Sequence, residues 1–151
     1  MNKKYLITYY SWSDNTKRVA KNIAAQLPNS NLAEIKVAPD VFSEDMYETF
    51  DISKEQIATN NYPDIDISID DFNQYDLILV GSPIWGGKPA TPIYTFLKKL
   101  NGYKGKVASF YTDVGSIEDY DKVFKQWADG LDVLPSGHGD RKLDEWTLTL
   151  Q

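Results

Sequence analysis

The sequence contains no cysteine and a single histidine, His138, and these two shortages exclude several kinds of chemistry. Without cysteine the chain can form no disulfide, no thiolate nucleophile and no iron–sulfur or cysteine-ligated zinc site. One histidine excludes a histidine-rich metal site, and a Ser-His-Asp triad would have to use His138 itself. We expect His138, in the segment SGHGD, to lie in a surface loop; proton donation at a nearby site is the alternative.

Long hydrophobic runs are also missing, and no segment approaches the roughly 18 apolar residues that indicate a membrane span. The short apolar run after Lys3 and Lys4 is broken at Ser11, which is not the pattern of a signal peptide. We therefore expect a single domain, residues 1–151, in the cytoplasm and without membrane contact. The formal net charge of −6 argues against nucleic-acid binding, which needs a basic patch, and favours basic protein partners.

Apolar patterns predict strands and helices that alternate along the chain. Runs rich in aliphatic, β-branched or aromatic residues predict strands over 4–10, 31–37, 77–81, 106–111 and 131–135. Helical spacing predicts helices around three sets of residues: Val19, Ile23 and Leu27; Ile93, Phe96, Leu97 and Leu100; Tyr120, Val123, Phe124 and Trp127. The alternation predicts an α/β fold in three layers, with an open parallel sheet between helices. Right-handed crossovers would place every strand-to-helix loop at one edge of that sheet, where ligands bind.

The middle of the chain and its C-terminal tail have weaker patterns. We predict a helix around residues 43–50 with Ser43 as its N-cap, and a second helical piece over 53–59. Strict alternation of isoleucine with polar residues over 64–71 predicts an extended segment with one buried face. The tail, residues 140–151, fits either a short helix or an added strand.

A loop rich in hydroxyl groups, residues 11–16, joins the first predicted strand to the first helix. The N–H groups at a helix start are unpaired and carry partial positive charge, so a phosphate bound there would receive amide and hydroxyl donors. The loop lacks both the GxxxxGK[ST] and the GxGxxG patterns of common nucleotide sites. The alternative is that Ser13 or Asp14 simply caps the helix.

Three segments, taken together, resemble the flavodoxin family. SWSDNT (11–16) is similar to the family's phosphate loop, whose usual form is S/T-x-T/S-G-x-T. YDLILVGSPIWGGKPATPIYTFL (75–97) resembles the family's third strand and the loop after it, and GKVASFYTDVGS (105–116) resembles the fourth strand and its loop. The matches come in the expected order and cover about residues 4–135 of the chain.

The resemblance implies a flavodoxin-like fold with strand order 2-1-3-4-5 and bound flavin mononucleotide (FMN). It implies that the FMN phosphate is held by Ser11, Trp12, Ser13, Asp14, Asn15 and Thr16. It also implies that the isoalloxazine lies between two further loops, formed by Pro83, Ile84, Trp85, Gly86 and Gly87 and by Thr112, Asp113, Val114 and Gly115. We expect Trp85 to stack on the flavin. The alternative is that the Trp85 side chain covers the third helix and has a structural role. Gly86 and Gly87 would permit positive φ and close backbone approach.

Two residues depart from the family pattern. Asp14 stands where the family usually has glycine; aspartate tolerates a left-handed conformation, but its carboxylate repels a phosphate unless it points away. Val114 also replaces a common glycine, and a β-branched residue resists positive φ. We expect both differences to weaken FMN binding.

From these observations we predict an FMN-binding, low-potential electron carrier that exchanges electrons with redox partner proteins or a small-molecule electron acceptor. An FMN-dependent NAD(P)H:quinone-type oxidoreductase is the first alternative. The second is a flavodoxin-like regulatory or binding module without catalysis, which the departures at Asp14 and Val114 would favour. We predict no catalytic side chain and no metal ligand.

Overall fold

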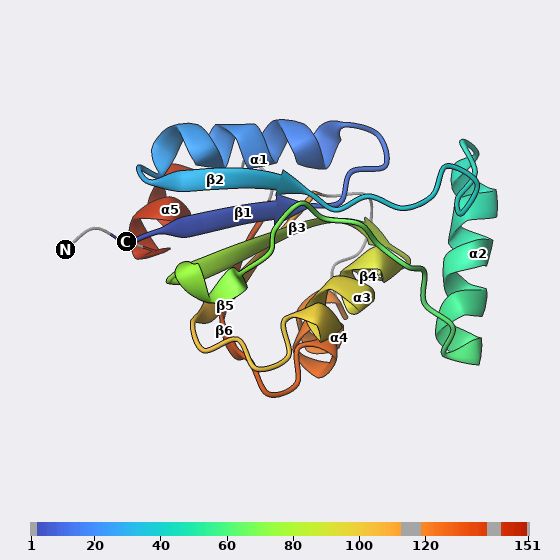
Figure 1. Cartoon of the computed structure of the whole chain (residues 1–151). Helices are drawn as coiled ribbons and strands as arrows, with labels where there is room; N and C mark the ends of the chain where they lie inside the picture. The colour runs from blue at the N-terminus through green and yellow to red at the C-terminus, as the bar shows by residue number, and fades with distance from the viewer. Residues whose placement is uncertain (1–2, 113–118, 139–142, 151) are drawn as a thin grey trace.

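The computed structural model describes residues 3–112, 119–138 and 143–150. Its centre is a sheet of five parallel strands joined side by side in the order β2-β1-β3-β5-β6 (Figure 1). The strands are β1 (Tyr5–Tyr9), β2 (Ser30–Glu34), β3 (Leu77–Trp85), β5 (Lys106–Thr112) and β6 (Asp132–His138). A two-residue strand, β4 (Lys88–Pro89), pairs antiparallel with the end of β3. Counted over the parallel strands alone, the predicted order 2-1-3-4-5 is confirmed.

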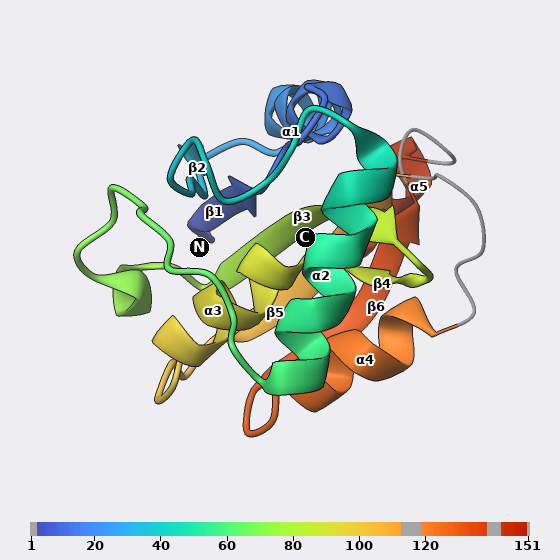
Figure 2. The same ribbon diagram turned by 90° about the vertical axis from the view of Figure 1, so that its right-hand side faces the viewer.

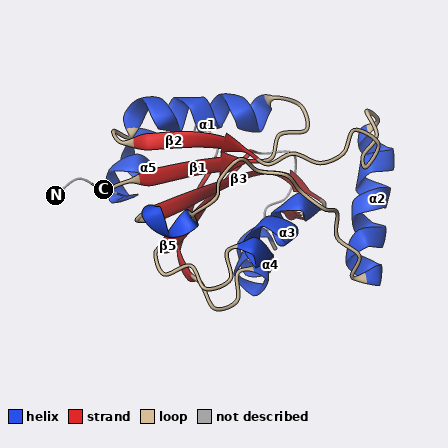
Figure 3. Cartoon of the chain, in the orientation of Figure 1, coloured by secondary structure: helices blue, strands red, loops and turns tan. Residues whose placement is uncertain are grey.

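Helices cover both faces of the sheet and complete three layers (Figure 3). One face carries α1 (Asn15–Gln26) and α5 (Leu143–Leu150), and the other carries α3 (Thr91–Lys99) and α4 (Tyr120–Trp127). The C-terminal tail is therefore a helix and not an added strand. None of the helices in the described ranges is both long enough and apolar enough to cross a bilayer.

Alternate side chains of each strand enter two separate cores. Ile7 of β1 and Leu79 of β3 pack with Ile23 of α1, whereas their neighbours Leu6 and Ile78 pack on the side of α3 and α4. All four strand residues are fully buried. Covering by helices on both sides explains why β3 has a continuous apolar run instead of alternating polar positions.

Helix α2 (Met46–Thr59) differs from the prediction of two helical pieces. Asp45 is its N-cap, because the Asp45 carboxylate accepts the Tyr47 N–H at 3.0 Å. Ser43 lies two residues earlier: its hydroxyl donates to the Glu48 carboxylate at 2.7 Å and accepts the Asp45 N–H at 3.0 Å. The prediction of Ser43 as N-cap was wrong, because this serine organises the turn before the helix.

Helix α2 also lies in an unusual place, beyond the carboxyl ends of the strands and across their direction (Figures 1 and 2). Only Thr49 and Ser53 of its residues are buried. In the segment after it, Ile65, Ile67 and Ile69 are half-buried against the core and the polar residues between them are exposed, as the alternation predicted. Asp66 forms an isolated antiparallel bridge with Lys36, and the chain bends at residues 68 and 70. The helix therefore stands over the edge at which a ligand is expected.

The segment after residue 81, predicted as a loop, is strand in its first half. Pro83 continues the parallel ladder opposite Thr112, and β3 ends only at Trp85. Gly86 (φ 60°) and Gly87 (φ 79°) then form a two-residue turn to β4, with both residues in the left-handed region as expected. A small 3-10 helix, η1 (Phe72–Gln74), precedes β3.

Candidate functional site

The three segments named from the sequence converge at the carboxyl edge of the sheet. Strand β1 lies between β2 and β3, and β3 lies between β1 and β5. The chain leaves β1 towards α1 on one face and leaves β3 towards α3 on the other, so strand order reverses beside β1. Such a switch point is where open α/β sheets bind their ligands.

The first segment ends at a helix start that the side chain of its N-cap residue does not cap. Asp14 occupies the N-cap position of α1 with φ 65° and ψ −4°, the left-handed conformation that the family's glycine would adopt. Its exposed side chain makes no capping hydrogen bond, and the first turn of α1 holds no acidic residue. The alternative in which the Asp14 side chain simply caps the helix is therefore wrong.

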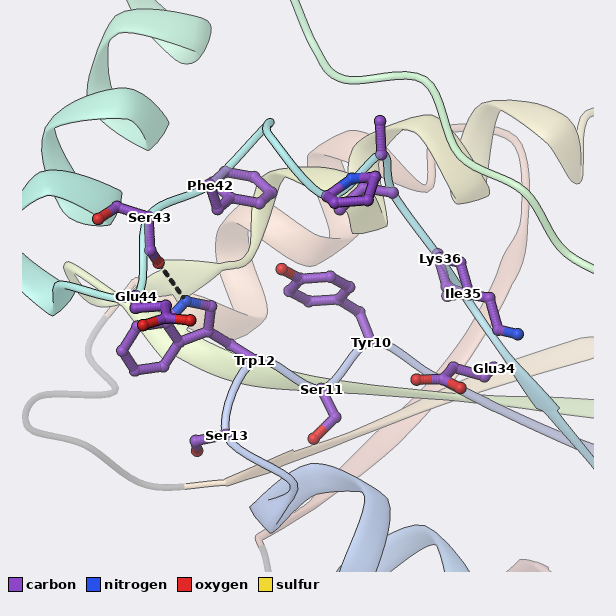
Figure 4. A pocket seen from close by; sticks show the side chains of 13 residues that line it. Tyr10, Ser11, Trp12, Ser13, Glu34, Ile35, Lys36, Phe42, Ser43 and Glu44 are labelled. Carbon is purple, nitrogen blue, oxygen red and sulfur yellow. Dashed lines mark hydrogen bonds between the residues drawn. The ribbon is translucent and has the colours of Figure 1, made fainter.

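Hydroxyl groups fix the loop to its neighbours. Ser11 points towards α1, away from the ring of Tyr10 (Figure 4), and its Oγ accepts the Lys17 N–H at 3.3 Å. The Oγ1 atoms of Thr16 and Thr112 lie 2.9 Å apart and share a buried hydrogen bond. The start of α1 is thus held directly against the end of β5, so the first and third predicted segments belong to one site.

The second segment forms one wall of the site. The Ser82 hydroxyl accepts the Ala90 N–H at 2.9 Å and donates to the Pro83 carbonyl at 2.7 Å, which holds the β3–β4 hairpin in place. A Cβ built on Gly86 would meet no atom within 4 Å. The turn therefore presents bare backbone next to open space, as a flat ring approaching edge-on would require.

Trp85 has a packing role in this structure. Its side chain is 6% exposed, and its indole contacts Phe42 edge-to-face at 5.0 Å and Tyr10 at 5.7 Å between ring centroids. The prediction that Trp85 stacks on a flavin stays a prediction. Burial also raises the pKa of the Tyr10 phenol well above its usual value, so Tyr10 remains neutral here.

A cavity of about 550 Å³ opens beside the phosphate loop, on the side of β2 (Figure 4). Ser11, Trp12 and Ser13 line it together with residues from the segment between β2 and α2. The Trp12 indole N–H donates to the Ser43 carbonyl at 2.9 Å and joins the two walls. Phe42 and Ser43 were not predicted as site residues. The sequence of residues 38–45 does not indicate that this segment lies against the loop over 11–16.

Some predicted positions fall outside the described residues, namely Asp113, Val114 and Gly115.

His138 is the last residue of β6 and pairs with Tyr111, so the expectation of a loop position was wrong. The register shifts between these strands: β5 advances two residues from Ala108 to Phe110 while β6 advances three from Leu134 to Gly137. The described ranges contain no cluster of three carboxylate, imidazole or thiol side chains suited to a metal ion.

The arrangement fits a phosphate-bearing ligand. The start of α1, where the Asp14 side chain accepts none of the N–H groups, offers N–H donors and a favourable dipole, and Ser11, Ser13 and Thr16 add hydroxyl groups around it. The exposed Asp14 carboxylate is the only acidic group within the loop itself. A ring attached to such a phosphate would extend towards the Gly86–Gly87 turn.

Comparison with known proteins agrees with this geometry. The sequence model of the family described as "Flavodoxin" matches residues 4–137. The chain is similar to a flavoprotein from Lactobacillus acidophilus NCFM solved in complex with FMN, with 46% identity, a TM-score of 0.90, and coverage of 96% of this chain and 99% of that one. The same organism's flavoprotein in its apo form gives 46% identity and a TM-score of 0.79, with coverage of 97% and 98%.

A more distant structure supports the fold alone. A putative flavoprotein from Bacteroides eggerthii DSM 20697 is 23% identical, with a TM-score of 0.82 and coverage of 99% of this chain and 96% of that one. A search of curated proteins found no match. The family match spans most of the chain and includes the three segments that build the site. This chain therefore belongs to the flavodoxin family.

Proposed function

We propose that this protein binds FMN at the carboxyl edge of its sheet and acts as a low-potential electron carrier in the cytoplasm. The observation that carries the FMN assignment is the start of α1, which the Asp14 side chain leaves uncapped and which the hydrogen bond between Thr16 and Thr112 holds against β5. The FMN complex of the flavoprotein from Lactobacillus acidophilus, 46% identical over nearly the whole chain, supports the same cofactor.

In this proposal each part of the site has a separate task. The N–H groups of Asn15 and Thr16, with the hydroxyls of Ser11 and Ser13, hold the phosphate at the positive end of α1. The Gly86–Gly87 turn accepts the edge of the ring system without steric obstruction. FMN, when bound, supplies one- and two-electron transfer, which no side chain of this protein supplies.

The distribution of charge supports a carrier that meets a basic protein. Residues 38–74, which include α2, contain ten carboxylates and a single cation, Lys54. The rest of the chain contains twelve carboxylates and fifteen lysine or arginine residues, so it is slightly positive. Six of the ten carboxylates, within residues 40–55, belong to α2 or to the loop before it, at the carboxyl edge of the sheet, where they would speed the encounter with a basic redox partner.

The absorption spectrum of the protein, recorded after addition of FMN and desalting, tests the cofactor. A retained flavin band displaced from that of free FMN supports the proposal. No retained band would contradict it and favour a regulatory or binding module without catalysis. Steady NADH or NADPH oxidation with a quinone by the FMN-loaded protein would instead favour the oxidoreductase alternative.

The carrier role is tested by the rate at which the reduced, FMN-loaded protein transfers electrons to a basic cytochrome c in stopped-flow mixing. We expect the rate to fall with ionic strength and to fall several-fold in the double variant Asp51→Asn/Glu55→Gln, because both carboxylates are exposed on α2. Asp132→Asn, at the start of β6, is the control and should change little. Equal rates in both variants would contradict an acidic docking side on α2.

A further inference from the structure

A second, smaller cavity lies between α2 and the β3–β4 turn, and it holds about 140 Å³. Its apolar walls are Phe50 and Ile57 from α2 and Trp85 from the end of β3. A protein cavity of about 150 Å³ lined by aliphatic and aromatic side chains is large enough for benzene. The space therefore matches one six-membered ring.

A serine also lines this cavity. Ser53 of α2 is 4% exposed and adds one hydroxyl group to the apolar walls. A hydroxyl group can donate to, or accept from, a polar atom of a bound molecule.

Two cations stand at the same cavity. Lys54 reaches it from α2 and Lys88 from β4, and neither ammonium group forms an ion pair or hydrogen bond with a described residue. Lys54 is the single cation of the acidic segment 38–74. Lys54 and Lys88 together give this cavity a local positive charge, although the segment around Lys54 is acidic.

We propose that this cavity is a binding site for a small aromatic carboxylate with one ring. The ring would lie among Phe50, Ile57 and Trp85, and the carboxylate would meet Lys54 and Lys88. Gly86, which the proposed function places at the edge of the flavin ring, also lines the cavity. The bound molecule would therefore lie next to the flavin; this last point rests on the proposed function.

Titration of the full-length protein with benzoate, followed by amide chemical shifts, tests the site. We expect saturable shifts confined to α2 and the β3–β4 turn, with and without FMN. Lys54→Gln and Lys88→Gln should each raise the dissociation constant about three- to fivefold, whereas Lys122→Gln, on the exposed side of α4, should not. Benzyl alcohol, a neutral molecule of similar size, should bind equally to all of these proteins.

Ser53→Leu provides a second test, because the larger side chain fills the cavity and should abolish benzoate binding while the protein stays folded. Shifts that map elsewhere, or a dissociation constant that neither lysine variant changes, would overturn the proposal. Benzoate binding that persists in a protein unable to retain FMN would support this site and contradict the proposed function instead.

Discussion

At the scale of single residues, Asp14 has the most distinctive conformation in the site. It holds φ 65° at the start of α1, where most side chains are strained by about 1–2 kcal/mol and aspartate by less. Its carboxylate makes no cap and is exposed, so the loop keeps the shape of a glycine-containing loop at the cost of a negative charge beside the phosphate position.

Replacing Asp14 with glycine should therefore tighten FMN binding, because the substitution removes the nearby charge and relieves the left-handed residue. Little cap stability is lost, since glycine at an N-cap costs only a few tenths of a kcal/mol. Fluorescence titration of FMN measures the effect, and Asp14→Asn is the matched control for charge alone. Equal or weaker binding by the glycine variant would show that the carboxylate does not repel the cofactor.

Trp85 is the second residue whose replacement is informative. Loss of its contacts with Tyr10 and Phe42 in Trp85→Ala should lower the free energy of unfolding by about 3–5 kcal/mol. If the indole also stacks on the flavin, Trp85→Ala should also bind FMN more weakly. Trp85→Phe should retain part of the stability and part of the FMN affinity. Urea denaturation and FMN titration measure the two effects separately. A destabilised variant that binds FMN with unchanged affinity would leave Trp85 with a packing role only.

At the scale of elements, α2 is weakly anchored for its length. It buries only Thr49 and Ser53, whereas α1 buries Val19, Ala20 and Ile23 against the sheet. A side-chain hydrogen bond from Thr91 to Gln56, at 2.5 Å, ties α2 to α3. The helix is thus attached by few buried groups, a condition that favours local opening.

Hydrogen exchange should show this difference directly. We expect the amides of α2 to exchange at least tenfold faster than those of α1, because less apolar surface must be exposed to open α2. Gln56→Ala should accelerate exchange in α2 further and leave α1 unchanged. Gln126→Ala, on the exposed side of α4, is the control. Uniform protection across α1 and α2 would contradict loose attachment.

Elements with strong local patterns could be predicted from the sequence, and their spatial neighbours could not. The apolar run of β3 and the helical stripe around Ile93 identify their structures without any knowledge of distant residues. The place of α2 depends on how its half-buried Phe50 and Ile57 pack against the core that contains Trp85, and no local pattern encodes that packing. The hydrogen bond between Thr16 and Thr112 is equally invisible in the sequence, although both residues were named for the site.

At the scale of the whole molecule, two cores share one sheet, and tyrosines extend them to its edges. Tyr103 is buried and donates its hydroxyl to the Tyr75 carbonyl at 3.0 Å. Burial first, and the nearby Asp76 carboxylate second, raise the pKa of Tyr103 to about 12. Burial likewise raises the pKa of Tyr120, whose hydroxyl lies 2.7 Å from that of Ser109. Folding thus favours the neutral form of these phenols.

These tyrosines should make stability depend on pH in the alkaline range. An unfolded tyrosine loses its proton near pH 10, whereas folded Tyr103 keeps it until about pH 12, so the contribution of Tyr103 to the free energy of unfolding should be constant below pH 10 and fall between these values. Tyr103→Phe should cost about 1 kcal/mol at neutral pH and make the alkaline fall shallower. Urea denaturation from pH 8 to 11 measures this, and parallel curves for the two proteins would contradict the assignment.

The hydrogen bond between Thr16 and Thr112 joins residues that are 96 positions apart. During synthesis the phosphate loop leaves the ribosome early, but the strand that completes its site follows only after most of the chain has been made. A nascent chain therefore lacks a finished cofactor site, and FMN would be acquired after synthesis has passed β5. The supply of FMN would then influence how much loaded protein accumulates, without influencing the first steps by which the chain folds.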